Sequence, residues 1–224
     1  ASWRDLQEVL DPHGLAVRIM QSYSGFSVGG SLSVNCHGRY VGKGPIINSV
    51  RGLKLVTAGG ELLAVSRTQH PELFAAAIGG YGGIGIIAEV DLELDRNSRI
   101  ARAGERVGLT EYPAWFAERV LADPQAVLHN ADLAPPHFDA PLAVSWRRSN
   151  DLPTITERLI PRDAGYARDA ALIWAASELP GGERIRDHEL TQRLLHERAV
   201  VWRNHEASRD IASLEPWTRR FSTY

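Results

Sequence analysis

The segment Ser27–Gly38, with the sequence SVGGSLSVNCHG, is the stretch that decides how this chain of 224 residues is interpreted. A second glycine-rich segment, Gly79–Glu89 (GGYGGIGIIAE), follows it. Glycine loses more backbone freedom on folding than any other residue, so dense glycine indicates sharp turns or close approach of the backbone to another group. Loops of this kind often direct backbone N–H groups at a phosphate. The two segments therefore predict a ligand-binding region in the first part of the chain.

The composition excludes several classes of protein. Hydrophobic residues make up 44% and charged residues 23%, which is ordinary for a globular protein. The net charge of -2 provides no overall field that would attract nucleic acid or a membrane surface, and neither is expected as a partner. No apolar run approaches the roughly 18 residues of a membrane-spanning helix. Cys36 is the only cysteine, so an intrachain disulfide is excluded, while the cellular compartment stays open.

Apolar periodicity and turn signals predict an α+β fold. A change of composition at Asp95–Arg99 predicts a boundary, which gives domains at residues 1–95 and 96–224. In the first domain we expect a capped helix over residues 2–10, strands over 15–20 and 84–94, a hairpin over 50–65, and a helix over 71–77.

The second domain has fewer glycines and more tryptophans. We expect helices over residues 111–121 and 187–200 and strands over 127–133 and 142–147. Trp146, Trp174 and Trp202 are expected to be core or interface anchors. His188 and His196 are two helical turns apart, too far to share a metal ion, so they are expected to be solvated and no metal site is predicted.

The segment Gly80–Gly85 matches the dinucleotide fingerprint G-x-G-x-x-G. That fingerprint requires a strand before it and a helix after it, so that the helix N-terminus meets the pyrophosphate. Here a helical pattern, Glu72–Ala77, comes before, and an extended pattern, Ile86–Val90, comes after. The reversed order argues against a Rossmann fold.

Several motifs in register resemble a different flavoprotein family. The motifs are Ser27–Ser33, Gly44–Val50, Leu55–Leu62, Pro71–Phe74 and Gly79–Ile87. In this order they resemble the FAD-binding domain of the vanillyl-alcohol oxidase and p-cresol methylhydroxylase (PCMH-type) superfamily. Cytokinin dehydrogenases, lactone oxidases and many bacterial FAD-linked oxidases belong to it. The resemblance covers about the first 95 residues. It implies the second half of a PCMH-type FAD-binding domain, followed by part of an α+β substrate cap domain.

The resemblance also implies that FAD is the cofactor. Its pyrophosphate and ribityl chain would pass along the first glycine-rich segment, and its adenine side would meet the backbone near Ile87. The candidate cofactor-binding residues are Val28, Gly29, Gly30, Ser33, Asn35, His37, Gly38, Gly85, Ile86 and Ile87. The alternative is that these glycines only form tight turns and that His37 only fixes the local loop. Cys36 is expected to be a small buried apolar residue rather than a site of covalent flavin attachment.

In the second domain, Arg203, His205 and Glu206 are the candidates for a catalytic role, with Asn204 beside them. Such a group can hold a polyol or an acid and remove a proton. An ion-paired helix on the surface would have the same sequence, and this is the interpretation that the residues alone favour.

The chain departs from the family at both ends. The family's N-terminal FAD subdomain and the C-terminal segment that completes the site are expected outside residues 1–224. The chain would then be the middle part of a flavoenzyme that by itself binds FAD weakly or not at all. The missing subdomain, as a separate segment or chain, would be its partner.

The implied activity is that of an FAD-dependent oxidoreductase. It would remove hydride from a small hydroxylated substrate, such as a sugar alcohol or an aldonolactone, while a base takes the proton. Two alternatives share the same motifs: a non-catalytic remnant or subunit that serves as a binding module, and a flavin-dependent reductase of C=C bonds. A sugar-binding module without flavin would differ from all of these in being colourless.

Overall fold

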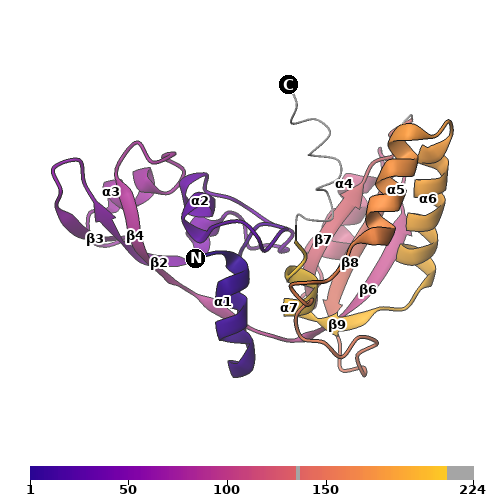
Figure 1. Cartoon of the computed structure of the whole chain (residues 1–224), viewed down its shortest axis with the longest axis horizontal. Helices are drawn as coiled ribbons and strands as arrows, with labels where there is room; N and C mark the ends of the chain where they lie inside the picture. The colour runs from indigo at the N-terminus through magenta and orange to yellow at the C-terminus, as the bar shows by residue number, and fades with distance from the viewer. Residues whose placement is uncertain (135–136, 211–224) are drawn as a thin grey trace. The chain divides into compact units, whose positions relative to one another are not determined.

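The computed structural model describes residues 1–134 and 137–210. The chain divides into two compact units, Ala1–Asn97 and a second that begins at Ser98. Each unit combines helices with antiparallel sheets, so the expected α+β class is confirmed (Figure 1). None of the described helices is long and apolar enough to cross a bilayer.

A three-stranded antiparallel sheet in the order β3-β2-β4 forms the centre of the first unit. The predicted hairpin is confirmed, and its register pairs Val56 with Leu62 on either side of the glycine turn. Alternate residues of the strands, such as Leu53 and Val65, are buried, and Phe74 of helix α3 is also buried in this unit. The elements are β2 (Val50–Val56), β3 (Leu62–Ser66), α3 (Pro71–Ala77) and β4 (Ile86–Leu92).

Helix α1 (Trp3–Leu10) begins at the predicted cap. The Ser2 hydroxyl accepts from the Asp5 amide at 3.2 Å, and the Asp5 carboxylate accepts from the Ser2 amide at 2.8 Å. These bonds satisfy donors that a helix N-terminus otherwise leaves unpaired. Trp3 is fully buried, and its indole N–H donates to the Ser31 hydroxyl at 2.8 Å. Trp3 therefore joins α1 to the first glycine-rich segment.

Two predictions for the first unit were wrong in detail. The segment predicted as a glycine loop contains a short helix, α2 (Val28–Ser33), because the Ser27 hydroxyl caps it by accepting from the Gly30 amide at 3.1 Å. The strand expected over residues 84–94 is interrupted at Glu93, whose amide donates to the Ser49 carbonyl at 2.7 Å. Beyond it, β5 (Leu94–Arg96) pairs instead with β1 (Leu15–Val17).

The second unit contains a four-stranded antiparallel sheet in the order β7-β8-β6-β9. Helices α5 and α6 lie side by side (Figure 1), and the helical turn that follows them lies against one face of the sheet. On that face a Cβ at Gly104 would lie 2.6 Å from the Leu194 carbonyl oxygen, so glycine allows the close approach. The elements are β6 (Arg99–Arg106), β7 (Ala126–Asp132), β8 (Leu142–Arg148), α5 (Ala167–Glu178), α6 (Gly182–Thr191), β9 (Val200–Trp202) and α7 (Arg203–Ala207).

The strands expected over 127–133 and 142–147 and the helix over 111–121 are confirmed. The helix is α4 (Tyr112–Phe116), continued by a π-helical turn, Ala117–Leu121. The helix expected over 187–200 was displaced, because α6 begins at Gly182 and β9 begins at Val200. Trp146 is buried, and Trp202 lies under the Arg158 guanidinium, 4.3 Å from its ring centroid. Trp174 is 53% exposed and therefore not in the core, so of its two expected roles only that of an interface anchor stays a prediction.

Candidate cofactor site

An apolar groove of about 560 Å³ lies within the first unit, between α1, the start of α2 and β4. Its walls are mainly aliphatic, and three of the predicted cofactor-binding residues are among them: Val28, Gly29 and Ile87. The aliphatic lining consists mainly of Leu6, Leu10, Val28, Leu32, Ile87, Val90, Leu92 and Leu94. The structure therefore brings together residues from both glycine-rich segments, which are far apart in the sequence.

Two backbone hydrogen bonds join the glycine-rich segments directly. The Gly79 amide donates to the Leu32 carbonyl at 2.9 Å, and the Tyr81 amide donates to the Ser33 carbonyl at 3.0 Å. The last turn of α2 is thus bound to the turn that leads into β4. The second glycine-rich segment therefore holds the first in place through these two hydrogen bonds.

Of the four glycines among the predicted cofactor-binding residues, three have close neighbours and one faces open space. A Cβ at Gly38 would lie 2.0 Å from the Met20 carbonyl oxygen, and one at Gly85 would lie 2.5 Å from the Val56 carbonyl oxygen. A Cβ at Gly30 would lie 2.8 Å from the hydroxyl of Ser27, its capping residue. A Cβ at Gly29 would have no atom within 4 Å. Gly29 is therefore the position where a missing side chain leaves room for a ligand.

Fewer backbone N–H groups at the start of α2 are free to bind a diphosphate than the sequence predicted. The Val28 amide donates to the Ala1 carbonyl at 3.0 Å, and the Gly30 amide donates to Ser27. Only the Gly29 amide, of these three, has no acceptor among the residues that the structure describes. A free first-turn amide can bind an anionic oxygen. One such donor, rather than a nest of three, is available to a diphosphate here.

The lining of the groove decides which part of FAD fits it. No arginine or lysine lines it, and Glu89 is its only acidic residue. Aliphatic walls suit a flat ring system such as adenine, whereas a diphosphate needs donors or cations. The residues present therefore fit the adenine end of FAD, and the start of α2 offers the diphosphate only the Gly29 amide.

The other predicted cofactor residues do not line this groove: Gly30, Ser33, Asn35, His37, Gly38, Gly85 and Ile86. Asn35 has a left-handed backbone (φ 45°), and its side-chain Oδ1 accepts from the Ile47 amide at 3.3 Å, so it shapes the loop. His37 is exposed. Ile86 is 71% exposed and pairs with Val56 at the end of the sheet. Their contact with a cofactor stays a prediction.

Several lining residues were not among the predicted site residues. Leu6 and Leu10 lie on the apolar face of α1, and Val90 and Leu92 belong to the alternating part of β4. The sequence contained this signal as helical and strand periodicity. Periodicity alone predicts a core, so it could not show that these faces would line a groove.

Cys36 is buried, and burial raises the pKa of its thiol to about 11. The hydrogen bond with Ser31 lowers the pKa only in part. Since the thiolate is the nucleophilic form, this cysteine is unreactive at neutral pH. That agrees with its expected role as a small buried residue.

The candidate catalytic residues of the second unit lie in and beside α7. Arg203 and Asn204 are only 3% and 1% exposed, so the expected surface position was wrong for these two residues. Burial lowers the pKa of His205, and the nearby Glu206 and Glu157 offset this only partly. The Nδ1 of His205 has no hydrogen-bond partner among the described atoms. Burial therefore favours the neutral imidazole of His205, whose Nδ1 makes no hydrogen bond to the residues that the structure describes.

A second histidine lies in an aromatic cluster that the sequence did not reveal. His129 Nε2 lies 2.6 Å from the Tyr112 hydroxyl, and its Nδ1 lies 2.8 Å from the Ser145 hydroxyl. The rings of Tyr112, Trp115 and Phe116 from α4 surround it. Burial lowers the pKa of His129 and raises that of Tyr112. The cluster fastens α4 to the sheet, and only cross-strand register places Ser145 opposite His129.

Within the described part of the chain, no three histidine, cysteine, aspartate or glutamate side chains are close enough to hold a metal ion. His188 and His196 are both exposed, as expected.

Comparisons with known proteins find similarity in the first part of the chain. Residues 1–66 match the family model for the FAD binding domain. Cytokinin dehydrogenase 6 of Oryza sativa subsp. japonica is 35% identical over 94 residues, which is 42% of this chain and 18% of that protein. L-galactono-1,4-lactone dehydrogenase 2, mitochondrial, of the same plant is 37% identical over 89 residues, or 40% of this chain and 15% of that protein.

A putative D-arabinono-1,4-lactone oxidase of Neurospora crassa is 38% identical over 85 residues, covering 38% of this chain and 15% of the oxidase. The chain thus spans less than a fifth of the length of these three curated relatives. The domain match begins at the first residue and ends in β3, so it includes α1 and the first glycine-rich segment. By these matches, the first part of the chain is similar to the FAD binding domain family and to short stretches of cytokinin and lactone dehydrogenases and oxidases.

Proposed function

We propose that this chain is part of an FAD-dependent oxidoreductase and that its first unit contributes one side of the cofactor site. The observation that carries the proposal is the apolar groove, where Val28 and Gly29 of the first glycine-rich segment meet Ile87 of the second. The match of residues 1–66 to an FAD binding domain supports it independently of the geometry.

Each part of the groove has a defined task in this proposal. The aliphatic side chains of Ile87, Val90 and Leu32 would contact the adenine end and exclude water from it. The Gly29 amide would donate to a diphosphate oxygen, and the absent side chain at Gly29 would leave space for it. Bound FAD would supply the acceptor for a hydride from the substrate.

The second unit would then contribute to the substrate side. We favour a small hydroxylated substrate, such as a sugar alcohol or an aldonolactone, because two of the three relatives compared are named for lactones. His205 is the best candidate base in this chain, since a neutral imidazole with an unused nitrogen can accept a proton. Arg203 and Glu206 would position it or bind substrate hydroxyls.

A titration of the chain with FAD, followed by quenching of flavin fluorescence, tests the cofactor site. We expect saturable binding with a dissociation constant on the order of micromolar or weaker. A Gly29→Val variant, which fills the open space, is expected to weaken binding about tenfold or more. Gly59→Val is the matched control, because its Cβ lies in an exposed turn, 3.7 Å from its nearest neighbour, Thr57 Oγ1. Two results would contradict the proposal: equal loss of binding in both variants, or fluorescence that stays unchanged both for this chain alone and for this chain supplied with an N-terminal FAD subdomain of the family.

Anaerobic mixing tests the reaction. With FAD bound, a sugar alcohol or an aldonolactone is expected to bleach the yellow flavin colour, and a His205→Gln variant is expected to slow the bleaching while leaving FAD binding unchanged. Bound FAD that no hydroxylated compound reduces would leave the cofactor site standing and overturn the proposed substrate class.

A further inference from the structure

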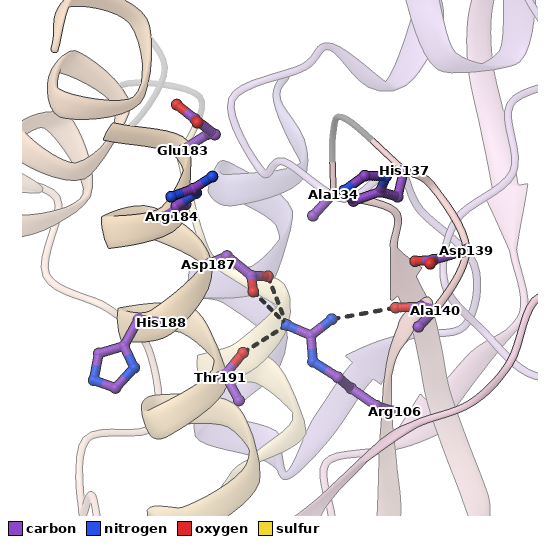
Figure 2. A pocket seen from close by; sticks show the side chains of 10 residues that line it. All are labelled: Arg106, Ala134, His137, Asp139, Ala140, Glu183, Arg184, Asp187, His188 and Thr191. Carbon is purple, nitrogen blue, oxygen red and sulfur yellow. Dashed lines mark hydrogen bonds and ion pairs between the residues drawn. The ribbon is translucent and has the colours of Figure 1, made fainter. Parts of the chain in front are cut away.

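A second cavity, of about 430 Å³, lies in the second unit and belongs to no part of the proposed cofactor site. Figure 2 shows it between helix α6 and the connection from β7 to β8, with Arg106 at the end of β6 below. We call it the charged cavity, after the six side chains that give it its character: Arg106, His137, Asp139, Glu183, Arg184 and Asp187.

The floor of the charged cavity is fixed. One nitrogen of the Arg106 guanidinium donates to both Asp187 carboxylate oxygens, at 2.6 and 2.7 Å, and to the Thr191 hydroxyl at 2.8 Å. The other terminal nitrogen donates to the Ala140 carbonyl at 3.2 Å. Figure 2 shows these bonds radiating from one guanidinium. They tie β6, α6 and the β7–β8 connection together, so the floor is preorganised before any ligand binds.

The walls of the charged cavity, in contrast, carry polar groups that are still available. Glu183 and Arg184 come from α6, and His137 and Asp139 come from the connection on the opposite side. Within the part of the chain that the structure describes, none of these four side chains makes a hydrogen bond or an ion pair. The Asp139 backbone is nevertheless held, because its carbonyl accepts from the Leu109 amide at 2.7 Å. Both walls therefore offer donors and acceptors to a molecule between them.

Charge and composition narrow the class of ligand. Two arginines face three carboxylates, those of Asp139, Glu183 and Asp187, so the lining is close to electrically balanced. A balanced lining does not favour a polyanion or a polycation. The only apolar lining residues are Ala134 and Ala140, which offer little to an apolar ligand. No metal-ion geometry is present among the described side chains.

A hydroxyl group matches such a lining, because it donates to a carboxylate and accepts from a guanidinium or an imidazole at the same time. We propose that the charged cavity is a binding site for a neutral, multiply hydroxylated small molecule, about the size of a pentitol or a hexose. The ligand bridges Glu183 and Arg184 on α6 to His137 and Asp139 on the connection. This site requires no flavin, so the inference goes beyond the proposed function.

Calorimetric titration of the flavin-free chain with D-sorbitol tests this site. We expect saturable binding with a dissociation constant on the order of 1 mM. Glu183→Ala and Asp139→Ala, on opposite walls, are each expected to weaken binding about tenfold, since each removes a charged acceptor. Glu118→Ala is the matched control, because it removes an exposed carboxylate of the same unit that does not line the cavity.

Three outcomes would overturn the inference: no saturable heat with sorbitol, equal affinity in the wall variants and the wild type, or loss of affinity in the control as well. Titrations with the anion D-gluconate and the cation spermidine test whether the charge-balanced lining prefers a neutral ligand to a charged one. If either of these binds more tightly than sorbitol and loses affinity in the wall variants, the site exists but its ligand is an ion, and the proposed class is wrong. Because FAD is absent throughout, a failure here leaves the cofactor site unaffected.

Discussion

The apolar groove of the first unit and the charged cavity of the second are of similar size but are built in opposite ways. The groove is lined mainly by leucine, valine and isoleucine side chains, and of the three amides at the start of α2 only that of Gly29 has no acceptor among the described residues. The cavity is lined by charged side chains around a fixed ion pair. Aliphatic walls exclude water and favour a flat ring, while mixed polar walls exchange water for hydroxyl groups. The lining, rather than the volume, therefore indicates what each site accepts.

The largest expected effect tests whether the groove depends on α1. Trp3→Ala removes a fully buried side chain and the indole donor to Ser31, and is expected to cost about 3–5 kcal/mol of the first unit's stability. Denaturant unfolding followed by circular dichroism measures it. Val9→Ala is the control in the same helix, since Val9 is 64% exposed, and is expected to change little. Equal losses in both variants would show that α1 does not support the groove through Trp3.

A smaller effect on the free energy of unfolding distinguishes a glycine required by packing, Gly85, from a glycine that faces open space, Gly29. Gly85→Ala places a Cβ 2.5 Å from the Val56 carbonyl oxygen and is expected to cost about 1–3 kcal/mol. Gly29→Ala meets nothing within 4 Å and is expected to leave unfolding within about 0.5 kcal/mol of wild type. If Gly29→Ala proved as destabilising as Gly85→Ala, Gly29 would be a packing glycine and not the open side of a site.

The third prediction concerns pH and the second unit. Burial lowers the pKa of His129 in the folded protein, so the unfolded chain binds the proton more readily. The contribution of neutral His129 to stability is therefore present above its unfolded pKa, about 6.5, and is lost as the pH falls below it. Urea unfolding between pH 7.5 and 5 measures this dependence. A His129→Gln variant is expected to have a flatter profile, and His205, whose pKa is also lowered, accounts for part of the remainder.

Tyr112→Phe removes the hydroxyl that lies 2.6 Å from His129 while keeping the ring, and is expected to cost about 1 kcal/mol at pH 7.5. An unchanged stability would mean that ring packing alone holds α4 in place. The matched control is Tyr81→Phe, because Tyr81 is 80% exposed.

The smallest expected effect is at the floor of the charged cavity. Arg106→Lys keeps the charge but loses the geometry that reaches Asp187, Thr191 and Ala140 together. Since this ion pair is partly exposed, the expected loss of stability is only about 0.5–1 kcal/mol. Thermal unfolding measures this loss. A loss as large as that of Trp3→Ala would show that the Arg106 ion pair stabilises the whole second unit and not only the floor of the cavity.

Local signals predicted the first unit well. The Ser2 and Asp5 cap, the hairpin with its glycine turn, and the proline at the start of α3 each act within a few residues, and the structure confirms all three. The helix at Val28–Ser33 was missed, because its glycines argue against a helix while the Ser27 cap and the Trp3 contact stabilise it. Tertiary contacts outweighed propensity there.

The sites were harder to predict than the elements. The order of the motifs predicted Val28, Gly29 and Ile87 as site residues, and the structure places them in the groove. It did not predict that the Val28 and Gly30 amides would donate hydrogen bonds to other groups of the chain. In the second unit the sequence revealed neither the pairing of His129 with Ser145 nor the charged cavity. Both depend on the register of strands and on helices far apart in the chain, which local patterns do not specify.

The hydrogen bond from the Trp3 indole to Ser31 also provides a probe of local opening, because the exchange rate of the indole N–H can be measured. The indole proton is shielded from water, so it can exchange with deuterium only when α1 separates from α2. In deuterated buffer, the decay of that single proton resonance would report how often this wall of the groove opens. A ligand that occupies the groove would slow the decay without any change in the average structure.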